Sequence, residues 1–488
     1  MAAIAVHGGK IRPRVVVVKA LASSICIGSG GSAGREGPIV QMGSAAGSAI
    51  AQKLGLSPYH TKILVACGAA GGIAGTFNTP IAGALFSVEL IMRELKIKSL
   101  MPIAISSVLA TLCSRILLRY LGAKTTFIFE IPQYSLKSPW ELLFYLILGF
   151  TAGIIATIFI HSLYKIEDIF NLIKIPDFVK PSLGGLVVGI TGLLLMLFTE
   201  RPFIFGVGYE VIEYILHQKP VFAIVVILVF LKIITTSFTL GSGGSGGVFA
   251  PSLFIGAMLG ASFGLLFNSL FPEITAGYEA YSIVGMAALF AGVSRAILTS
   301  IIIIFEMTGD YAIILPLMFS SVISSAICSL LVKESIYTLK LSRRGIIIDQ
   351  EMDVNLMRTI KVRDIMKRDV DTVSEDMSVS ELLSKMMETG HMGFPVVDRD
   401  NRLVGIVTHN DVEKVTGSEA RVRDIMTTNL IVADPEETLE EVLLKVGGRD
   451  VSHFPVVDPQ NRDRLIGFFT KGDILRTYMR KRAEEYRR

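Results

Sequence analysis

One carboxylate, that of Glu36, stands where a glycine-rich stretch runs into an apolar segment. The stretch, residues 28–38, reads Gly-Ser-Gly-Gly-Ser-Ala-Gly-Arg-Glu-Gly-Pro. A second junction of the same kind lies at 241–260. The first turn of a helix presents unpaired amide N–H groups and the positive end of the helix dipole. Two such starts directed at one point would bind an anion without any buried Lys or Arg side chain.

Backbone amides are the anion ligands that these junctions predict. A conducted ion must bind well enough to enter its site and weakly enough to leave it, and glycine lets the backbone approach an ion closely. The plainer interpretation is a flexible linker, but a linker would not run directly into apolar segments of helix length. The expected ligands are the amides of Gly37, Val248 and Phe249.

Glu36 itself has two interpretations. A carboxylate at a helix start can be an ordinary cap, but a lone acid in an apolar stretch is costly and indicates function. In the functional interpretation the charged carboxylate competes with the anion for one positive site, and its protonation or displacement opens the path. The neighbouring Arg35 is either an ion-pair partner or a charge that attracts anions, and the sequence leaves both open.

Composition divides the chain of 488 residues into two unlike parts. Residues 1–350 contain few charges and many runs long enough to cross or re-enter a bilayer. Residues 351–488 have the composition of a soluble domain. The net charge of +4 is small and unclustered, which argues against a nucleic-acid partner. The four cysteines stand singly, so no metal is expected, and no nucleophile–base pair suggests an enzyme.

Apolar runs predict a polytopic helical membrane domain. Several are short or interrupted, as at Asn78-Thr79-Pro80, and such breaks are tolerated in lipid only where the chain is buried in protein or lines a cavity. We therefore expect re-entrant half-helices, followed by a basic, cytoplasmic exit at Lys340, Arg343 and Arg344. The expected segments lie near 13–27, 37–54, 61–75, 80–95, 98–120, 140–163, 181–199, 221–240, 248–268, 281–307 and 311–333.

The tail contains an internal repeat. Arg363-Asp-Ile-Met366 recurs as Arg423-Asp-Ile-Met426, and Phe394-Pro-Val-Val-Asp398 recurs as Phe454-Pro-Val-Val-Asp458. Each copy alternates amphipathic helical stretches with short β-branched strands, which predicts two pseudo-symmetric α/β halves.

These motifs resemble two known families. The tail closely resembles a pair of cystathionine-β-synthase-type (CBS) domains. The membrane part resembles the chloride channel (CLC) family of channels and chloride/proton exchangers. Gly34-Arg-Glu-Gly-Pro38 matches that family's gating segment, Gly247-Val-Phe-Ala-Pro251 its Gly-x-Phe-x-Pro segment, and Tyr337 its pore tyrosine. The resemblance implies that Glu36 is the gate and that the Tyr337 phenol binds chloride.

The CBS resemblance also implies a ligand. Some CBS pairs bind the ribose and phosphates of adenine nucleotides (ATP, ADP or AMP) at positions that match Thr408, Asp411, Thr470 and Asp473 here. Simple turn capping is the alternative, because Thr and Asp favour helix starts. Whether the CBS pair binds a nucleotide or its Thr and Asp residues only cap turns, no cofactor is expected to be required for transport.

The sequence departs from the chloride channel family in two places. An earlier Gly-Ser-Gly-x-Pro segment of the family is expected to be missing, since the chain begins just after its place. Exchanger members also carry two adjacent glutamates in the segment that here ends in Glu89-Leu90. Leu90 replaces the second, which relays protons in those members, and Glu89 is either a proton-path residue or a hydrogen-bonded structural acid.

Taken together, we expect a CLC-like polytopic α-helical membrane protein with a cytoplasmic α/β tandem CBS domain, and a homodimer. The expected function is Glu36-gated chloride transport across the membrane, regulated by the CBS domains. The alternatives are a proton-coupled exchanger of chloride or another small anion, and a non-conducting fragment whose tail senses nucleotides. The expected parts are a membrane domain at 1–343, a linker at 344–355, CBS domains at 356–415 and 416–480, and a basic tail at 481–488.

Overall fold

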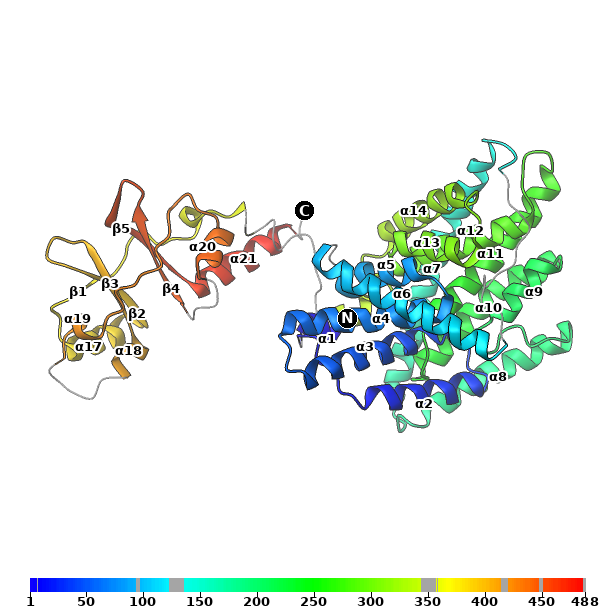
Figure 1. Cartoon of the computed structure of the whole chain (residues 1–488), viewed down its shortest axis with the longest axis horizontal. Coiled ribbons are helices and arrows are strands. Elements are labelled where there is room, and N and C mark those ends of the chain that lie inside the picture. Colours follow the sequence, from blue (N-terminus) through cyan, green and yellow to red (C-terminus); the bar gives the residue numbers. More distant parts are fainter. Residues whose placement is uncertain are drawn as a thin grey trace. The chain divides into compact units, whose positions relative to one another are not determined.

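The computed structural model divides the chain into two compact units, Met1–Ile348 and Asp349–Arg488 (Figure 1). It describes residues 1–6, 8–93, 97–122, 136–343, 357, 359–413, 420–446 and 451–485. The expected linker at 344–355 lies outside the described residues, as do Arg344, the start of the second CBS domain at 416–419 and the end of the basic tail at 486–488.

Helices make up the first unit. Six of those described are long and apolar enough to cross a membrane, namely α6, α7, α8, α10, α11 and α14. The elements are α1 (Ala2–Val6), α2 (Val15–Gly28), α3 (Glu36–Lys53), α4 (Pro58–Phe77), α5 (Pro80–Phe86), η1 (Ser87–Met92), α6 (Ile97–Tyr120), α7 (Glu141–Leu172), α8 (Lys180–Thr199), α9 (Tyr209–His217), α10 (Phe222–Gly241), α11 (Phe249–Leu270), α12 (Tyr278–Ser294), α13 (Ile297–Thr308), α14 (Ile314–Leu331) and α15 (Leu339–Ser342).

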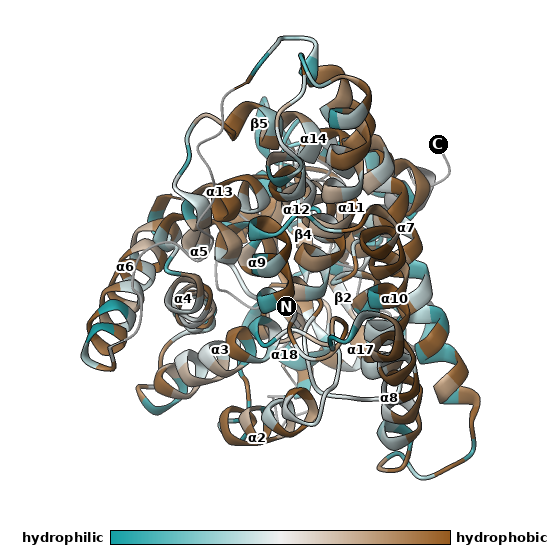
Figure 2. Cartoon of the chain, turned by 90° about the vertical axis from the view of Figure 1, so that its right-hand side faces the viewer, coloured by the Kyte–Doolittle hydropathy of each residue, from teal (hydrophilic) through white to brown (hydrophobic). Residues whose placement is uncertain are grey.

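The outer surface of this unit is apolar. Figure 2 shows brown, hydrophobic residues along the outer helices and more teal at helix ends and loops. Large side chains such as Phe198 and Leu330 are 86% and 83% exposed. Such a surface is stable in lipid and unfavourable in water. The predicted polytopic helical membrane fold is confirmed.

Two interruptions divide the apolar runs into half-helices. The predicted break follows α4, where Asn78 adopts φ 60° and Pro80 starts α5. The expectation of one continuous segment at 281–307 is wrong, because Arg295 adopts φ 65° between α12 and α13. The Arg295 guanidinium donates to the carbonyls of Cys328 (2.9 Å) and Val332 (2.7 Å) at the end of α14. α12 therefore ends through a tertiary contact of Arg295, and not through a Gly or Pro at the break, where the sequence reads Ser294-Arg295-Ala296.

Small residues allow the central helices to pack closely. A Cβ at Gly256 of α11 would lie 2.3 Å from the carbonyl oxygen of Gly285 in α12, and a Cβ at Gly285 would lie 2.2 Å from that of Gly256. In lipid the hydrophobic effect does not drive helices together, so helix association depends on the van der Waals contact that such close backbone approach provides. It makes α11, whose start carries the second glycine-rich junction, part of the buried centre of the unit.

The second unit has the predicted α/β repeat. β2 pairs antiparallel with β3 and β4 with β5 in equivalent registers, since Gly393 opposes Thr408 and His453 opposes Thr470. β1 pairs in parallel with β2. The elements are η2 (Val362–Asp364), β1 (Val373–Ser374), α17 (Val379–Thr389), β2 (Gly393–Val397), β3 (Leu403–Thr408), α18 (His409–Glu413), α19 (Val422–Ile425), α20 (Leu439–Val446), β4 (His453–Asp458), β5 (Asn461–Thr470) and α21 (Lys471–Glu485).

Each repeat completes the core of the other. Val422, near the start of the second repeat, is buried in the first repeat's core, and its amide donates to the Met377 carbonyl (2.9 Å). Ile360, near the start of the first repeat, is buried in the second repeat's core and accepts from the Leu439 amide (3.0 Å). The two halves are therefore interlocked rather than merely adjacent.

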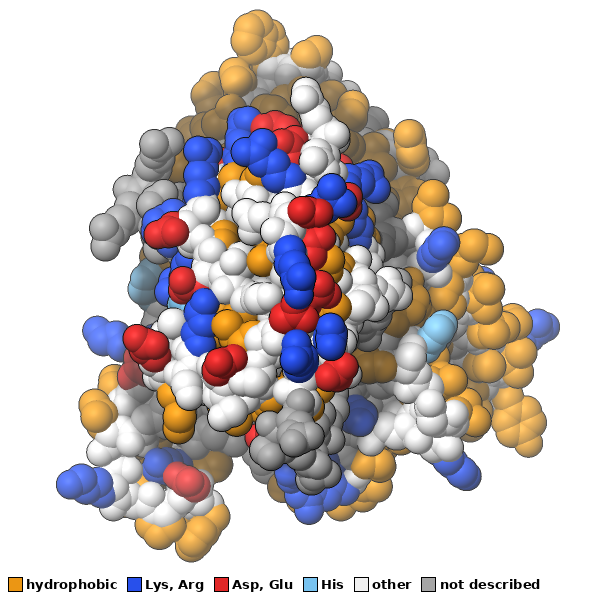
Figure 3. All heavy atoms as spheres, turned by 90° about the vertical axis from the view of Figure 1, so that its left-hand side faces the viewer, with side chains coloured by type: hydrophobic (Ala, Val, Ile, Leu, Met, Phe, Trp, Pro, Cys, Tyr) orange, Lys and Arg blue, Asp and Glu red, His pale blue; other side chains and the backbone are white. Residues whose placement is uncertain are grey.

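Charges of both signs cover the soluble unit. On the face seen in Figure 3, basic and acidic side chains are interspersed. Ion pairs of this unit include Arg423 with Asp376 (3.1 Å) and Lys361 with Glu436 (2.6 Å). A mixed surface of this kind keeps a domain soluble in water.

Candidate anion site

The two glycine-rich loops are joined directly by their backbones. The Gly34 amide donates to the Gly247 carbonyl and the Gly247 amide donates to the Gly34 carbonyl, both at 2.8 Å. A Cβ at Gly247 would lie 2.8 Å from the amide nitrogen of Gly37, and a Cβ at Gly37 would lie 3.0 Å from the Gly247 Cα. Glycine is thus required at both positions for the loops to approach.

This pairing brings two helix starts together. α3 begins at Glu36 and α11 at Phe249, two residues after the paired glycines in each loop. Both helices have proline at their third position, Pro38 and Pro251, where the missing N–H would have no acceptor within the helix in any case. The remaining first-turn amides and the positive ends of both helix dipoles therefore lie beside one another.

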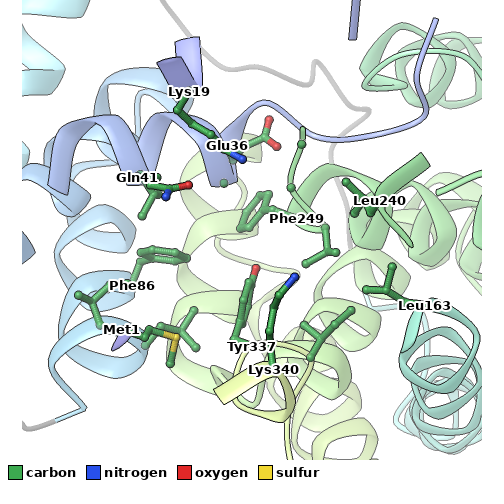
Figure 4. A pocket seen from close by; sticks show the side chains of 18 of the residues that line it. Met1, Lys19, Glu36, Gln41, Phe86, Leu163, Leu240, Phe249, Tyr337 and Lys340 are labelled. Carbon is green, nitrogen blue, oxygen red and sulfur yellow. The ribbon is translucent and has the colours of Figure 1, made fainter. Parts of the chain in front are cut away.

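A cavity of about 420 Å³ opens at this place (Figure 4). In Figure 4 the Tyr337 hydroxyl points into the cavity toward Phe249. Five of the predicted site residues line it, namely Glu36, Gly37, Val248, Phe249 and Tyr337. Its charged wall residues are Glu36, Lys19, Glu167 and Lys340, of which the last two form an ion pair (3.1 Å). The structure therefore brings most of the predicted anion site to one cavity.

Glu36 is a buried residue of the cavity wall. Its side chain is 1% exposed, and Oε1 accepts a hydrogen bond from the Tyr209 hydroxyl (2.8 Å). Among the described residues, Oε2 is buried without a hydrogen-bond partner. A Cβ at Gly34 would lie 2.4 Å from Oε2 and 3.1 Å from the Ala250 amide nitrogen, so the carboxylate crowds the start of α11. The carboxylate thus stands where the helix starts would hold an anion.

Arg35 lies beside the carboxylate but does not line the cavity described above. Its side chain is 55% exposed, and Nε is 3.9 Å from Glu36 Oε1. The guanidinium also lies over the Tyr209 ring, 6.0 Å from its centroid. Arg35 and Tyr209 together flank Glu36 on a side that the cavity does not reach.

Tyr209 is the site residue that sequence reasoning missed. It begins α9, and its ring meets Phe77 edge-on (centroids 6.1 Å apart), which in turn packs against Phe249 (5.1 Å). The Gly206-Val-Gly-Tyr209 stretch indicates a tight turn into a helix, but nothing in it identifies Glu36 as the partner of the phenol. Only the tertiary fold connects the two residues.

Tyr337 is held by its backbone neighbours. The Tyr164 hydroxyl donates to the Ile336 carbonyl (2.6 Å), and the Ile336 amide donates to the Val293 carbonyl at the end of α12 (3.0 Å). Both contacts fix the chain immediately before Tyr337, so the phenol is positioned by α7 and α12.

Glu89 is turned away from the cavity and Leu90 lines it. The Glu89 carboxylate accepts from the amides of Leu298 (3.2 Å) and Thr299 (2.8 Å) and from the Thr299 hydroxyl (2.7 Å), at the start of α13. Leu90, which follows it, is among the cavity residues. These contacts favour the structural interpretation of Glu89.

The predicted nucleotide residues lie in two different clefts of the second unit. Thr408 and Asp411 line a cleft of about 810 Å³, and Thr470 and Asp473 line one of about 360 Å³. In each pair the threonine hydroxyl donates to the aspartate Oδ2 at 2.7 Å. Those bonds are the turn capping that is the alternative to nucleotide binding. Both pairs nevertheless line a cleft that is open to a ligand.

The fold defines a helical membrane protein in which two paired helix starts and a buried carboxylate meet at one cavity, and comparisons with known proteins agree. Residues 1–329 match the family model of the voltage gated chloride channel, and residues 362–416 and 422–480 match that of the CBS domain. The chain therefore belongs to the voltage gated chloride channel family and carries two CBS domains.

Several relatives are similar over most of the chain. The H(+)/Cl(−) exchange transporter ClcA of Vibrio cholerae is 33% identical over 332 residues, which are 68% of this chain and 70% of the relative. Chloride channel protein CLC-f of Arabidopsis thaliana is 31% identical over 459 residues, which are 83% of this chain and 57% of that longer protein. The solved structure of a slow cyanobacterial Cl−/H+ antiporter aligns with a TM-score of 0.61 at 28% identity and covers 68% of this chain and 76% of its own.

Proposed function

We propose that this protein moves chloride across a membrane and that the Glu36 carboxylate is its gate. One observation carries the proposal: the carboxylate is buried at the start of α11, next to the site where two helix starts converge on a cavity. A negative carboxylate at this point competes with an anion for the same positive potential. Protonation removes the competing charge, so the path conducts when Glu36 is neutral or displaced.

The proposed ligands are the amides of Gly37, Val248 and Phe249 together with the Tyr337 phenol. All four residues line the same cavity as Glu36. Amide and phenol donors stabilise chloride without the strong attraction of a buried cation, which suits an ion that must also leave. We assign Arg35 to the other side of the gate, where its exposed guanidinium attracts anions toward Glu36.

The favoured mechanism is passive conduction. Exchanger members of the family relay protons through a second glutamate, and at its position this chain has Leu90, which lines the cavity and cannot hold a proton. The second candidate is proton-coupled exchange of chloride or another small anion. It is supported by similarity to the exchanger ClcA and to the solved structure of a CLC-type fluoride/proton antiporter (25% identity, TM-score 0.56, covering 68% of this chain and 78% of its own).

Chloride efflux from proteoliposomes tests the gate. The parent protein should conduct more as the pH falls, and Glu36→Gln, which mimics the neutral carboxyl, should conduct at all pH values. Glu210→Gln is the matched control, because Glu210 is an exposed acid in the first turn of α9, beside Tyr209. Unchanged pH dependence in Glu36→Gln would overturn the assignment.

We further propose that the CBS pair binds an adenine nucleotide and thereby regulates conduction. Support comes from the two clefts, each bordered by one Thr–Asp pair. The smaller cleft also contains the basic side chains Lys367 and Arg476, which can pair with a phosphate, beside the acidic Asp369 and Asp371. Isothermal titration of the full chain with ATP, ADP and AMP tests this. Asp411→Ala should abolish binding at the larger cleft and Asp473→Ala at the smaller; no heat with any nucleotide at millimolar concentration would contradict the proposal.

A cytoplasmic tail and a homodimer complete the proposal. Lys340 and Arg343 follow the last membrane helix and pair with Glu167 and Asp168 at one end of α7. Because basic residues beside membrane helices favour the cytoplasmic side, we place this end of the domain, and the CBS domains that follow it in the chain, in the cytoplasm. Protease added to right-side-out vesicles should therefore spare the CBS domains. Light scattering of the detergent-solubilised protein should give the mass of two chains.

A further inference from the structure

A lysine is buried at the centre of α10. Lys232 is fully buried, and its ammonium lies 4.8 Å from the centroid of the Phe254 ring. No carboxylate of the described residues pairs with it. Removing an ammonium from water is costly unless other groups replace its hydration, so this residue needs an explanation beyond packing.

The ammonium is satisfied by one loop. Nζ donates to the carbonyls of Ile204 (3.2 Å) and Gly206 (3.1 Å), in the loop between α8 and α9. Gly206 and Gly208 of this loop have φ 61° and 94°. A Cβ at Gly208 would lie 2.7 Å from the Phe254 ring and 3.4 Å from Nζ. Lys232 and Phe254 thus fix the backbone up to the residue before Tyr209.

Tyr209 is the next residue, and its hydroxyl donates to Glu36 Oε1 at 2.8 Å. A hydrogen bond from a phenol to a carboxylate is strongest when the carboxylate is charged. In the blocking position it therefore stabilises the charged form of Glu36, which is the closed state of the gate. The loop held by Lys232 determines whether the phenol can reach that position.

We propose that Lys232 is a positioning residue for the gate: it holds the 204–208 loop so that Tyr209 keeps the Glu36 carboxylate closed. The proposal rests on Glu36 being the gate. Other charged or titratable groups near Glu36 include Arg35 beside it and Tyr164, Tyr337, Lys19, Glu167 and Lys340 on the cavity wall, and all of them remain in the variants below. Among the described residues, the Lys232 ammonium contacts the backbone carbonyls of Ile204 and Gly206 and the ring of Phe254.

The sign of the effect follows from the direction of the hydrogen bond. Loss of the phenol donor destabilises the charged, closed carboxylate, so Glu36 becomes neutral or is displaced more readily. The pH at which chloride efflux is half-maximal should then rise. A hydrogen bond to a charged group corresponds to a shift of about one pH unit or more.

The experiment measures chloride efflux against pH in proteoliposomes containing the full chain. Tyr209→Phe should raise the half-maximal pH by about one unit. Lys232→Met should raise it in the same direction, and Lys232→Arg, which keeps a cationic donor, should restore most of the parent value. In the double variant Lys232→Met/Tyr209→Phe the shift of the half-maximal pH should equal that of Tyr209→Phe alone, because Lys232 acts only by positioning the Tyr209 hydroxyl.

Three results would overturn the inference while leaving the gate intact. They are an unchanged half-maximal pH in a folded Lys232→Met protein, a further shift on adding Lys232→Met to Tyr209→Phe, and no rescue by Lys232→Arg. Lys232→Gln, which keeps a donor without the charge, replaces Lys232→Met if that variant does not fold. Glu36→Gln is measured in parallel, since persistent pH dependence there would overturn the gate itself rather than the role of Lys232.

Discussion

Glu306 caps α5, which continues into the η1 turn that carries Glu89, and Glu89 caps α13, which carries Glu306. The Glu89 carboxylate, just after α5, accepts from the amides of Leu298 and Thr299 at the start of α13. The Glu306 carboxylate, near the end of α13, accepts from the amides of Ile81 (3.0 Å) and Ala82 (2.7 Å) at the start of α5. The two half-helices are therefore antiparallel and joined at both ends by the same contact.

This symmetry predicts matched losses of stability. A hydrogen bond from an amide to a charged group contributes about 1.5–3 kcal/mol, so Glu89→Gln and Glu306→Gln should both lower the thermal unfolding midpoint of the purified protein, by similar amounts. Differential scanning fluorimetry in detergent measures both. A large loss in only one variant would contradict the reciprocal capping.

The same contacts predict that chloride movement is not coupled to protons. With Glu89 engaged by α13 and Leu90 on the cavity wall, no titratable group of this segment borders the cavity. Proteoliposomes with an outward chloride gradient and an internal pH-sensitive dye should show no uphill proton movement. Uphill movement that Glu36→Gln abolishes, and that Glu89→Gln but not Glu306→Gln reduces, would make Glu89 a proton relay.

Most of the residues that meet at the cavity could be predicted because their signals are local. Glu36, Gly37, Val248 and Phe249 each lie within a glycine-rich junction whose spacing indicates a helix start. The break at Arg295 and the contact of Tyr209 with Glu36 could not be predicted, because both depend on partners far along the chain. In the sequence, Lys232 is recognisable only as a single charge within an apolar run. Its contact with the Gly206 carbonyl, 26 residues earlier, is seen only in the folded structure.

Removal of the Tyr337 hydroxyl should weaken chloride binding without unfolding the protein. One hydrogen bond to an ion contributes about 1.5–3 kcal/mol, so Tyr337→Phe should lower the chloride affinity roughly tenfold or more. Isothermal titration with chloride measures this, and Tyr311→Phe, at a tyrosine that is 72% exposed, is the control. Equal affinities in Tyr337→Phe and the parent would remove the phenol from the site.

The interlocked cores predict that the CBS repeats fold only together. A fragment spanning 359–485 contains both repeats with Ile360 and Val422, and it should unfold in one cooperative transition. A fragment ending at 413 lacks Val422, a buried part of the first core, and should lack a transition. Circular dichroism during heating distinguishes them, and cooperative unfolding of the shorter fragment would contradict the interlocking.

Acid should destabilise this tail through His453. Its ring stacks on Phe468 and packs over Gly393, and burial lowers the pKa of the imidazole below its ordinary value. The unfolded chain therefore binds a proton more readily than the folded one. Stability is retained above the ordinary histidine pKa of about 6.5 and is lost as the pH falls from there toward the lower folded value.

His453→Phe keeps an aromatic ring in contact with Phe468 and removes the titration. The tail carrying it should lose less of its free energy of unfolding between pH 7 and pH 5 than the parent tail. Urea denaturation at both pH values gives that difference. If the free energy of unfolding falls by the same amount in parent and variant, protonation of His453 is not the cause of the destabilisation in acid.

The most direct test of the gate is the pH dependence of chloride efflux in Glu36→Gln. We predict efflux at pH 7.5 that matches efflux at pH 4.5, while the parent and Glu210→Gln conduct more at the lower pH. A Glu36→Gln protein that folds, conducts and still responds to pH as the parent does would show that Glu36 is not the gate.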